Sequence, residues 1–109
     1  MQADTDASLM EIGRSMHWQV YILLCSDRSL YTGISTDVQR RFAQHAAGRG
    51  AKYFRGRSPQ QIVYLESGHD RSSASRRELA IKKLSVAEKR ALIVSAQNKV
   101  ASLEEEERL

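Results

Sequence analysis

Arg41 and His45 are four residues apart in a stretch whose pattern is helical, so both side chains fall on one side of that helix. An arginine offers a planar set of donors that matches a phosphate, and a histidine can donate a hydrogen bond to the same group or take a proton from water. The pair therefore indicates a site that handles phosphate. Two ordinary surface residues would show the same spacing, so the spacing alone does not decide.

Glu78 falls between Ala74 and Ile81 on the inward stripe expected for a later helix, where an apolar residue would be usual. An unpaired buried carboxylate is costly, so Glu78 needs a cation close by. We expect either a structural ion pair with Arg41 or a hard ion such as Mg²⁺ held by this carboxylate, by water and by a substrate phosphate.

Tyr21 and Tyr31 lie in an expected hairpin, and their relation depends on the length of the turn between them. With a five-residue turn over Cys25–Ser29, both tyrosines share one face of the sheet with Leu23 and Gly33. A four-residue turn would put the two tyrosines on opposite faces, and the sequence does not choose between these turns.

These candidate residues are distributed over several short elements. Alternating and helical patterns predict strands over 18–24, 30–34 and 61–66, and helices over 37–48, 73–84 and 86–97. The order β-β-α-β-α-α predicts an α+β domain in α/β/α layers, with a small, three-stranded, largely antiparallel sheet flanked by helices. We place this domain at residues 17–97, between a flexible segment at 1–16 and an acidic, solvated tail at 98–109 that is helical or frayed.

Local signals mark where the helices begin. Thr36 is expected to cap the first helix, with Gln39 reaching back to it in a capping box. Asp70 and Ser85 are expected to cap the second and third helices. The buried stripe of the first helix is predicted to consist of residues four apart: Val38, Phe42 and Ala46.

The charge of the chain is concentrated in its middle. The 109 residues carry a net charge of +4, but residues 17–90 hold 14 Lys and Arg against 6 Asp and Glu. The 18 residues 40–57 include six cations and no acid, with two aromatic rings placed between the later cations: Arg40, Arg41, Arg49, Lys52, Tyr53, Phe54, Arg55 and Arg57. Basic residues interleaved with rings suit a nucleic acid, although a solvated loop would have a similar composition.

Two further features restrict the class of protein. Cys25 is the one cysteine, which disfavours both a disulfide scaffold and a structural zinc site and fits a reducing cytoplasm. The longest apolar run, Val20–Cys25, is too short to cross a bilayer, so we expect no membrane association.

The ordered set of these residues resembles the GIY-YIG nuclease superfamily over about residues 17–94, and especially its small stand-alone bacterial members. Gln19-Val20-Tyr21 stands where the family has Gly-Ile-Tyr, and Tyr31-Thr32-Gly33 stands where it has Tyr-Ile-Gly. The chain departs from the pattern at Gln19, at Ile34, where some relatives carry lysine, and in lacking a clear match for an asparagine that often follows the glutamate.

The resemblance implies an endonuclease that hydrolyses phosphodiester bonds with a single Mg²⁺ or Mn²⁺ ion, and implies DNA rather than RNA as substrate. Its catalytic residues would be Tyr21, Tyr31, Arg41, His45 and Glu78, which we expect to converge on one wet cleft. Arg41 would bind the scissile phosphate and Glu78 the metal, while Tyr21, Tyr31 or His45 would serve as general base. Residues expected to contact the nucleic acid are Gly33, Arg40, Lys52, Tyr53, Arg55 and Arg57.

Two other interpretations remain open from the sequence. The domain could bind nucleic acid with little or no cleavage, taking its specificity from the basic loop or from a partner protein. The last two helices could instead form a helix-turn-helix DNA reader, but this would leave Glu78 on the inner stripe unexplained.

Overall fold

The computed structural model describes residues 16–108, so the segment expected to be flexible, 1–16, lies almost wholly outside it. The elements in chain order are β1 (Trp18–Cys25), β2 (Leu30–Ser35), α2 (Val38–Ala46), a 3₁₀ turn η1 (Lys52–Phe54), β3 (Pro59–His69), α3 (Arg71–Lys82), α4 (Val86–Ile93) and α5 (Val100–Arg108). The predicted α+β class and element order are confirmed, with α5 added at the end.

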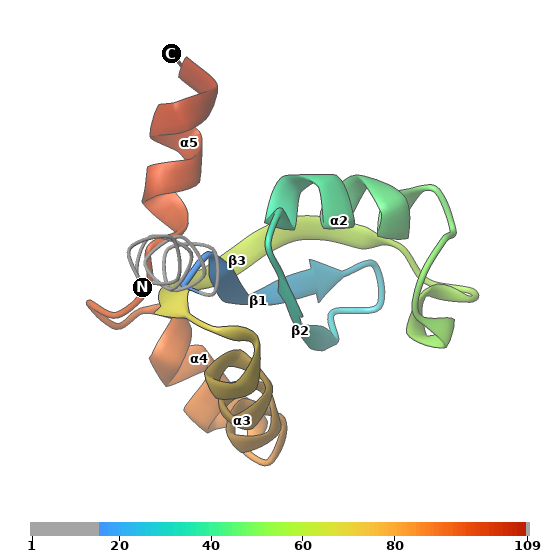
Figure 1. The fold of residues 1–109 in the computed structure, drawn as a ribbon. Coiled ribbons are helices and arrows are strands. Elements are labelled where there is room, and N and C mark those ends of the chain that lie inside the picture. Colours follow the sequence, from blue (N-terminus) through green and yellow to red (C-terminus); the bar gives the residue numbers. More distant parts are fainter. Residues whose placement is uncertain (1–15, 109) are drawn as a thin grey trace.

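The sheet is antiparallel with the order β2-β1-β3, so β1 is its central strand. Helix α2 covers one face, α3 and α4 cover the other, and α5 projects away from the layers (Figure 1). Both faces of β1 are consequently buried. Tyr21 and Leu23 contribute to the core on the α2 side, and Val20 and Ile22 to the core on the α3 side.

The β1–β2 hairpin has the longer of the two turns considered. Leu24 pairs with Leu30, so the five residues between them form the turn. Tyr21 is then directly opposite Gly33, and Leu23 is opposite Tyr31. The two tyrosines therefore share the α2 face of the sheet, and the shorter turn is excluded.

Helix α2 begins one residue later than predicted. Asp37, not Thr36, is its N-cap, and the Asp37 carboxylate accepts a hydrogen bond from the backbone N–H of Arg40 at 3.1 Å. The expected capping box between Thr36 and Gln39 is therefore wrong. Both Thr36 and Asp37 are good capping residues, and the charged oxygen is the stronger acceptor.

The buried face of α2 also differs from the prediction at one position. Val38 and His45 are buried, Phe42 is half-buried, and Ala46 is exposed. Steps of four residues drift by about 40° each, so Ala46 leaves the face that Val38 defines, whereas a step of seven returns to within about 20°. His45 thus occupies the core position that was assigned to an alanine.

The later helices begin at the predicted caps. Asp70 and Ser73 form a reciprocal capping box at the start of α3, and Ser85 and Glu88 form one at the start of α4. Helix α4 ends at Ile93, four residues before the predicted end.

The chain leaves α4 early because Asn98 binds the outer edge of β3. Its amide donates to the carbonyls of Val63 and Ile93, both at 2.8 Å, and its oxygen accepts from the N–H of Leu65 at 3.1 Å. Beyond it, Leu103 of α5 is buried against the core on the α2 face, so this part of the expected solvated tail packs on the domain. Within residues 16–108, no helix is both long and apolar enough to cross a membrane.

Candidate active site

The centre of the site is a buried pair between β1 and α2. The Tyr21 hydroxyl lies 3.2 Å from Nε2 of His45, and each residue is only 1% exposed. The register places Tyr21 toward α2, and the helical spacing returns His45 to the same face as Val38, so the two meet across 24 residues of sequence. This pair is covered, whereas an open, wet cleft was expected.

Tyr31 stands beside this pair on the edge strand β2. Its ring centroid is 6.4 Å from that of Tyr21 and 5.4 Å from that of His45, and the Tyr31 and His45 rings form a T-shaped pair. Phe54 and Tyr53 of η1 pack on its other sides at 4.9 and 5.0 Å. Tyr31 is half-buried, so it is the more accessible of the two phenols.

Arg41 approaches the phenols from α2. It is half-buried, and its Nη1 donates to Oε1 of Gln44 at 3.0 Å. Its charge lowers the pKa of both Tyr21 and Tyr31, against larger effects of burial, so it lies close to both rings. Arg40 and Arg41 also line a small polar hollow of about 180 Å³ at the start of α2.

Glu78 approaches from α3, on the other face of the sheet, and its charge acts to raise the pKa of the same two tyrosines. The charges of Arg41 and Glu78 therefore both act on the two phenols, from opposite faces of the sheet. The expected ion pair between them is wrong, because Glu78 pairs with Lys82 at 3.4 Å and Arg41 with Gln44.

The orientation of α3 is set by a separate contact with the sheet. Arg77 Nε donates to both carboxylate oxygens of Glu66 on β3 at 3.1 Å, and Glu66 also accepts from the Tyr64 hydroxyl at 2.6 Å. This contact fixes the rotation of α3 and with it the place of Glu78, the next residue along the helix.

Burial dominates the proton affinities in the site. It raises the pKa of Tyr21, with smaller increases from Tyr31 and Glu78, and it raises the pKa of Tyr31. Burial lowers the pKa of His45 below 6.5, and the charge of Arg41 lowers it further. At neutral pH both phenols are therefore protonated and the imidazole is neutral, which makes His45 the strongest proton acceptor of the three.

The donor set at Glu78 is compatible with one kind of metal. In the described part of the chain no three His, Cys, Asp or Glu side chains gather to form a cage for an ion. Mg²⁺ does not require one, since it commonly binds through one or two carboxylates and keeps water and substrate phosphate as its other ligands. Glu78, with 21% of its side chain exposed, fits that role once Lys82 is displaced.

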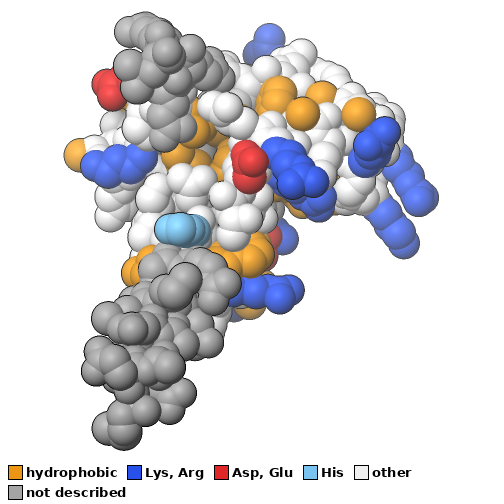
Figure 2. Space-filling view, turned by 45° about the horizontal axis from the view of Figure 1, so that its top comes forward, with side chains coloured by type: hydrophobic (Ala, Val, Ile, Leu, Met, Phe, Trp, Pro, Cys, Tyr) orange, Lys and Arg blue, Asp and Glu red, His pale blue; other side chains and the backbone are white. Residues whose placement is uncertain are grey.

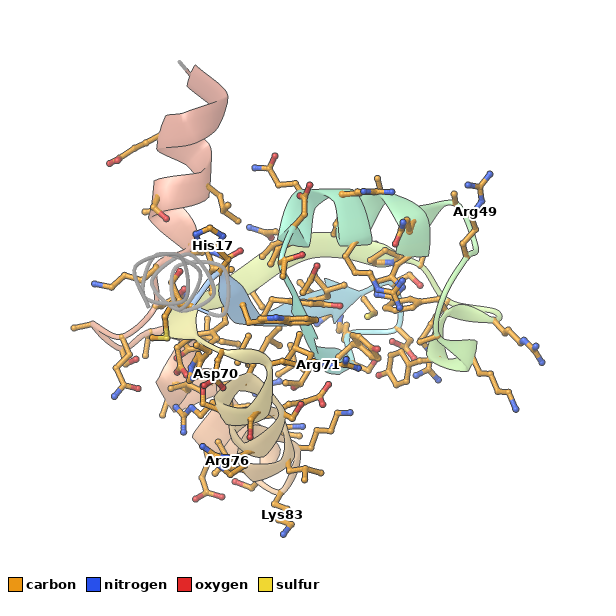
Figure 3. The ribbon with its side chains drawn as sticks, viewed as in Figure 1. His17, Arg49, Asp70, Arg71, Arg76 and Lys83 are labelled. Carbon is orange, nitrogen blue, oxygen red and sulfur yellow. The ribbon has the colours of Figure 1, made fainter. Side chains whose placement is uncertain are left out.

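The residues expected to contact nucleic acid fall into two groups. Arg40, Lys52 and Arg55 are exposed, and Figure 2 shows Lys and Arg side chains gathered on the side of the molecule that carries α2 and the following loop. Arg49, also in that loop, points outward (Figure 3). Tyr53 and Arg57 are instead engaged within the protein, with the guanidinium carbon of Arg57 4.0 Å from the centre of the Tyr53 ring.

Gly33, which is expected to contact the nucleic acid, has a structural role that the sequence did not show. It is buried beneath Tyr21, and a Cβ atom on it would lie 2.6 Å from Tyr21 Cζ. The absence of a side chain therefore makes room for the Tyr21 ring, and the contact of Gly33 with nucleic acid stays a prediction.

Gly50 is a site residue that sequence reasoning missed. Its φ of +96° suits glycine, and a Cβ there would lie 3.1 Å from His45 Nδ1 and 3.2 Å from Arg41 Nη2. The backbone at Gly50 thus closes over both side chains. The sequence signal was the glycine itself, which on its own indicates only a loop.

Most of this chain is similar in sequence to known proteins. A model of the GIY-YIG catalytic domain matches residues 17–91. UPF0213 protein VNG_2274C of Halobacterium salinarum is 56% identical over 77 residues, which cover 71% of this chain and 99% of that protein. UPF0213 protein DP2720 of Desulfotalea psychrophila is 48% identical over 81 residues, covering 73% and 74%.

A solution NMR structure of UPF0213 protein BH0048 from Bacillus halodurans is 43% identical and covers 75% of this chain and 87% of that one, with a TM-score of 0.48. The names of these relatives state no activity. The domain match covers most of the chain and spans all five candidate catalytic residues. The relatives named above are similar to this chain along most of their own length. The chain therefore belongs to the GIY-YIG family of nuclease domains.

Proposed function

We propose that the chain is an endonuclease that hydrolyses phosphodiester bonds in nucleic acid, with DNA as substrate and one Mg²⁺ or Mn²⁺ ion as cofactor. The observation that carries the proposal is the 3.2 Å contact between the Tyr21 hydroxyl and His45 Nε2, beside Tyr31 and between the charges of Arg41 and Glu78. Phosphodiester hydrolysis needs such groups around one hydroxyl: a proton acceptor, a cation, and a carboxylate that can hold a hard metal ion.

His45 acts as the general base through Tyr21. The raised pKa of Tyr21 means that its phenolate cannot be stored at neutral pH, whereas neutral His45 can accept a proton. In the proposed step, once substrate binding has opened the covered pair to water, water attacks phosphorus and loses its proton to the Tyr21 oxygen, while the Tyr21 proton moves to His45 Nε2. The bond from phosphorus to the leaving oxygen breaks as the bond to water forms.

Arg41 and Tyr31 position the substrate. Arg41 neutralises the charge that develops on the phosphate oxygens, and it adjoins the polar hollow that a phosphate can enter. Tyr31, the more accessible phenol, donates to the attacking water or to the phosphate. A divalent ion bound by Glu78 would supply Lewis-acid stabilisation of the leaving oxygen.

The test is incubation of the protein with end-labelled single-stranded, duplex and flap DNA and with RNA, in the presence of Mg²⁺ or Mn²⁺. Cleavage should disappear with a chelator, with Glu78→Ala and with Arg41→Ala, while the circular dichroism of both variants stays native. Full activity in either variant would refute the mechanism.

Matched controls separate loss of chemistry from loss of charge. Glu105 is an exposed glutamate on α5, so Glu105→Ala should cleave like the wild type. Arg40 precedes Arg41 but is exposed, so Arg40→Ala should weaken binding and its salt dependence while leaving the rate at saturating substrate nearly unchanged.

A second candidate is a nucleic-acid-binding domain with little or no cleavage, whose specificity comes from a partner protein. The observation in its favour is that Lys82 occupies the carboxylate of Glu78, and that no group of three His, Cys, Asp or Glu side chains able to hold an ion occurs among the described residues. Salt-sensitive binding without a metal requirement and without product would select this function.

A further inference from the structure

The turn of the β1–β2 hairpin is fastened to the end of the basic loop, residues 48–58. The N–H of Ser26 donates to the carbonyl of Ser58 at 2.8 Å, and the N–H of Ser58 donates to Oγ of Ser26 at 3.0 Å. Cys25 pairs with Pro59 immediately beyond. These contacts place the side chains of Asp27 and Arg57 next to each other.

The carboxylate of Asp27 is ionised and oriented to pair with a cation. One of its carboxylate oxygens accepts from the N–H of Ser29 at 3.0 Å, and the other lies 3.1 Å from Nε of Arg57. Hydrogen bonds from Ser29, with a smaller contribution from Arg57, lower the pKa of Asp27, so the carboxylate is ionised. The pair is well exposed, so it contributes little to stability, and its effect is on geometry.

Arg57 links the Asp27 carboxylate to the packed rings of Tyr53 and Tyr31. With Nε bound to Asp27, its guanidinium carbon sits 4.0 Å from the centre of the Tyr53 ring, within the range of a cation–π contact. Tyr53 packs on Tyr31 at 5.0 Å between ring centroids. Ring contacts, with no hydrogen bond to another described residue, hold the Tyr31 side chain, so its orientation depends on this packing.

We propose that Asp27 is a positioning residue, which holds Arg57 over Tyr53 and so fixes the ring against which Tyr31 is oriented. Arg57 then acts inside the protein and is not a phosphate ligand, contrary to the expectation from its place in a basic loop. The inference rests on the proposed nuclease function for its kinetic consequence, but its structural part can be measured without activity.

The kinetic test uses Asp27→Asn, which keeps the shape of the side chain and removes its charge. Because an exposed ion pair biases an orientation only modestly, more frequent misplacement of Tyr31 should reduce kcat by about two- to fivefold. KM and the melting temperature should stay nearly unchanged. Asp27→Glu should retain more of kcat than Asp27→Asn.

Arg57→Lys keeps the charge but loses the flat guanidinium, so it should give the same loss of kcat, and the double variant with Asp27→Asn should be no worse than either alone. Arg55→Gln is the matched control. Arg55 is an exposed cation in the same loop, so its loss should raise KM and leave kcat nearly unchanged. A rise in KM without loss of kcat in Asp27→Asn would overturn the proposal, as would wild-type values for both.

An NMR measurement decides the structural part. In the wild type, the ring current of Tyr53 should shift the Arg57 side-chain protons upfield. Asp27→Asn should remove most of that shift and move the ring signals of Tyr31. Unchanged signals in Asp27→Asn would refute the positioning role, whether or not the wild type cleaves nucleic acid. If the signals change but the wild type is inactive, the positioning role stands and only the proposed nuclease function is refuted.

Discussion

Replacement of Gly33 by alanine tests whether glycine is needed at this position to leave space for the Tyr21 ring. The new Cβ would lie 2.6 Å from Tyr21 Cζ and closer still to the hydroxyl oxygen, and the ring is only 1% exposed, so it has no solvent to move into. Overpacking of this kind costs about 1–3 kcal/mol. Alanine recovers roughly 0.5–1 kcal/mol by restricting the unfolded chain. The net expectation is a loss of about 1–2 kcal/mol.

Urea unfolding followed by circular dichroism measures this change, together with a thermal scan. A loss of this size lowers the melting temperature by about 5–15 °C in a domain of this length. Displacement of the Tyr21 hydroxyl from His45 should also reduce cleavage about 100-fold or more. In a Tyr21→Phe background the closest contact is gone, so Gly33→Ala should cost less there.

The opposite results would refute this reasoning. If Gly33 served only to admit a substrate, Gly33→Ala would be as stable as the wild type or slightly more stable, and KM alone would rise. An equal cost of Gly33→Ala in the wild-type and Tyr21→Phe backgrounds would likewise show that the ring is not what the glycine accommodates.

The site and its supports yield three further predictions. Burial lowers the pKa of His45 below 6.5, so on acidification the unfolded chain gains this proton before the folded chain does. The free energy of unfolding, measured with urea, should therefore be highest above pH 6.5 and decline as the pH falls below it. His45→Gln should flatten this slope. Lys82→Gln removes the ammonium 3.4 Å from Glu78 and should tighten Mn²⁺ binding about two- to fivefold by EPR titration without nucleic acid. Asn98→Ala leaves three main-chain groups of the β3 edge and α4 without their partner and should destabilise the domain by about 2–4 kcal/mol in the same unfolding assay.

Each of these has a matched control or a contradicting result. An acid slope that persists in His45→Gln would mean that another group titrates there. Lys83 is exposed at the far end of α3 (Figure 3), so Lys83→Gln removes the same charge, and an equal gain in Mn²⁺ affinity from it would show a general charge effect. Wild-type stability in Asn98→Ala would mean that water replaces the amide at no cost.

The sequence predicted the element order well because the periodic patterns and two capping boxes are local signals. Asp70 with Ser73, and Ser85 with Glu88, need only neighbours three residues away. The predicted start of α2 was wrong by one residue, because Thr36 and Asp37 are adjacent and give the same local capping signal. The length of the hairpin turn could not be chosen, because it depends on how both strands pair with the rest of the sheet.

The site was predicted as a set of residues but not as an arrangement. Periodicity left His45 out of the predicted buried stripe of the helix, whereas the hydroxyl of Tyr21, 24 residues earlier, provides the partner that allows an imidazole to be buried. Arg57 looked like a free cation because its carboxylate, Asp27, is 30 residues away in sequence. Such partners are set by tertiary packing, which single-sequence patterns do not contain.

Among the strands of residues 16–108, the one that carries Tyr21 has a neighbour on each side, and its two faces lie in two separate cores. Local opening at the helices, at the basic loop or at either outer strand leaves such a strand in place, so its amide protons should be the last to exchange with solvent. The reacting hydroxyl is therefore anchored in the most persistent part of the molecule, and heat should abolish its environment only when the whole domain melts.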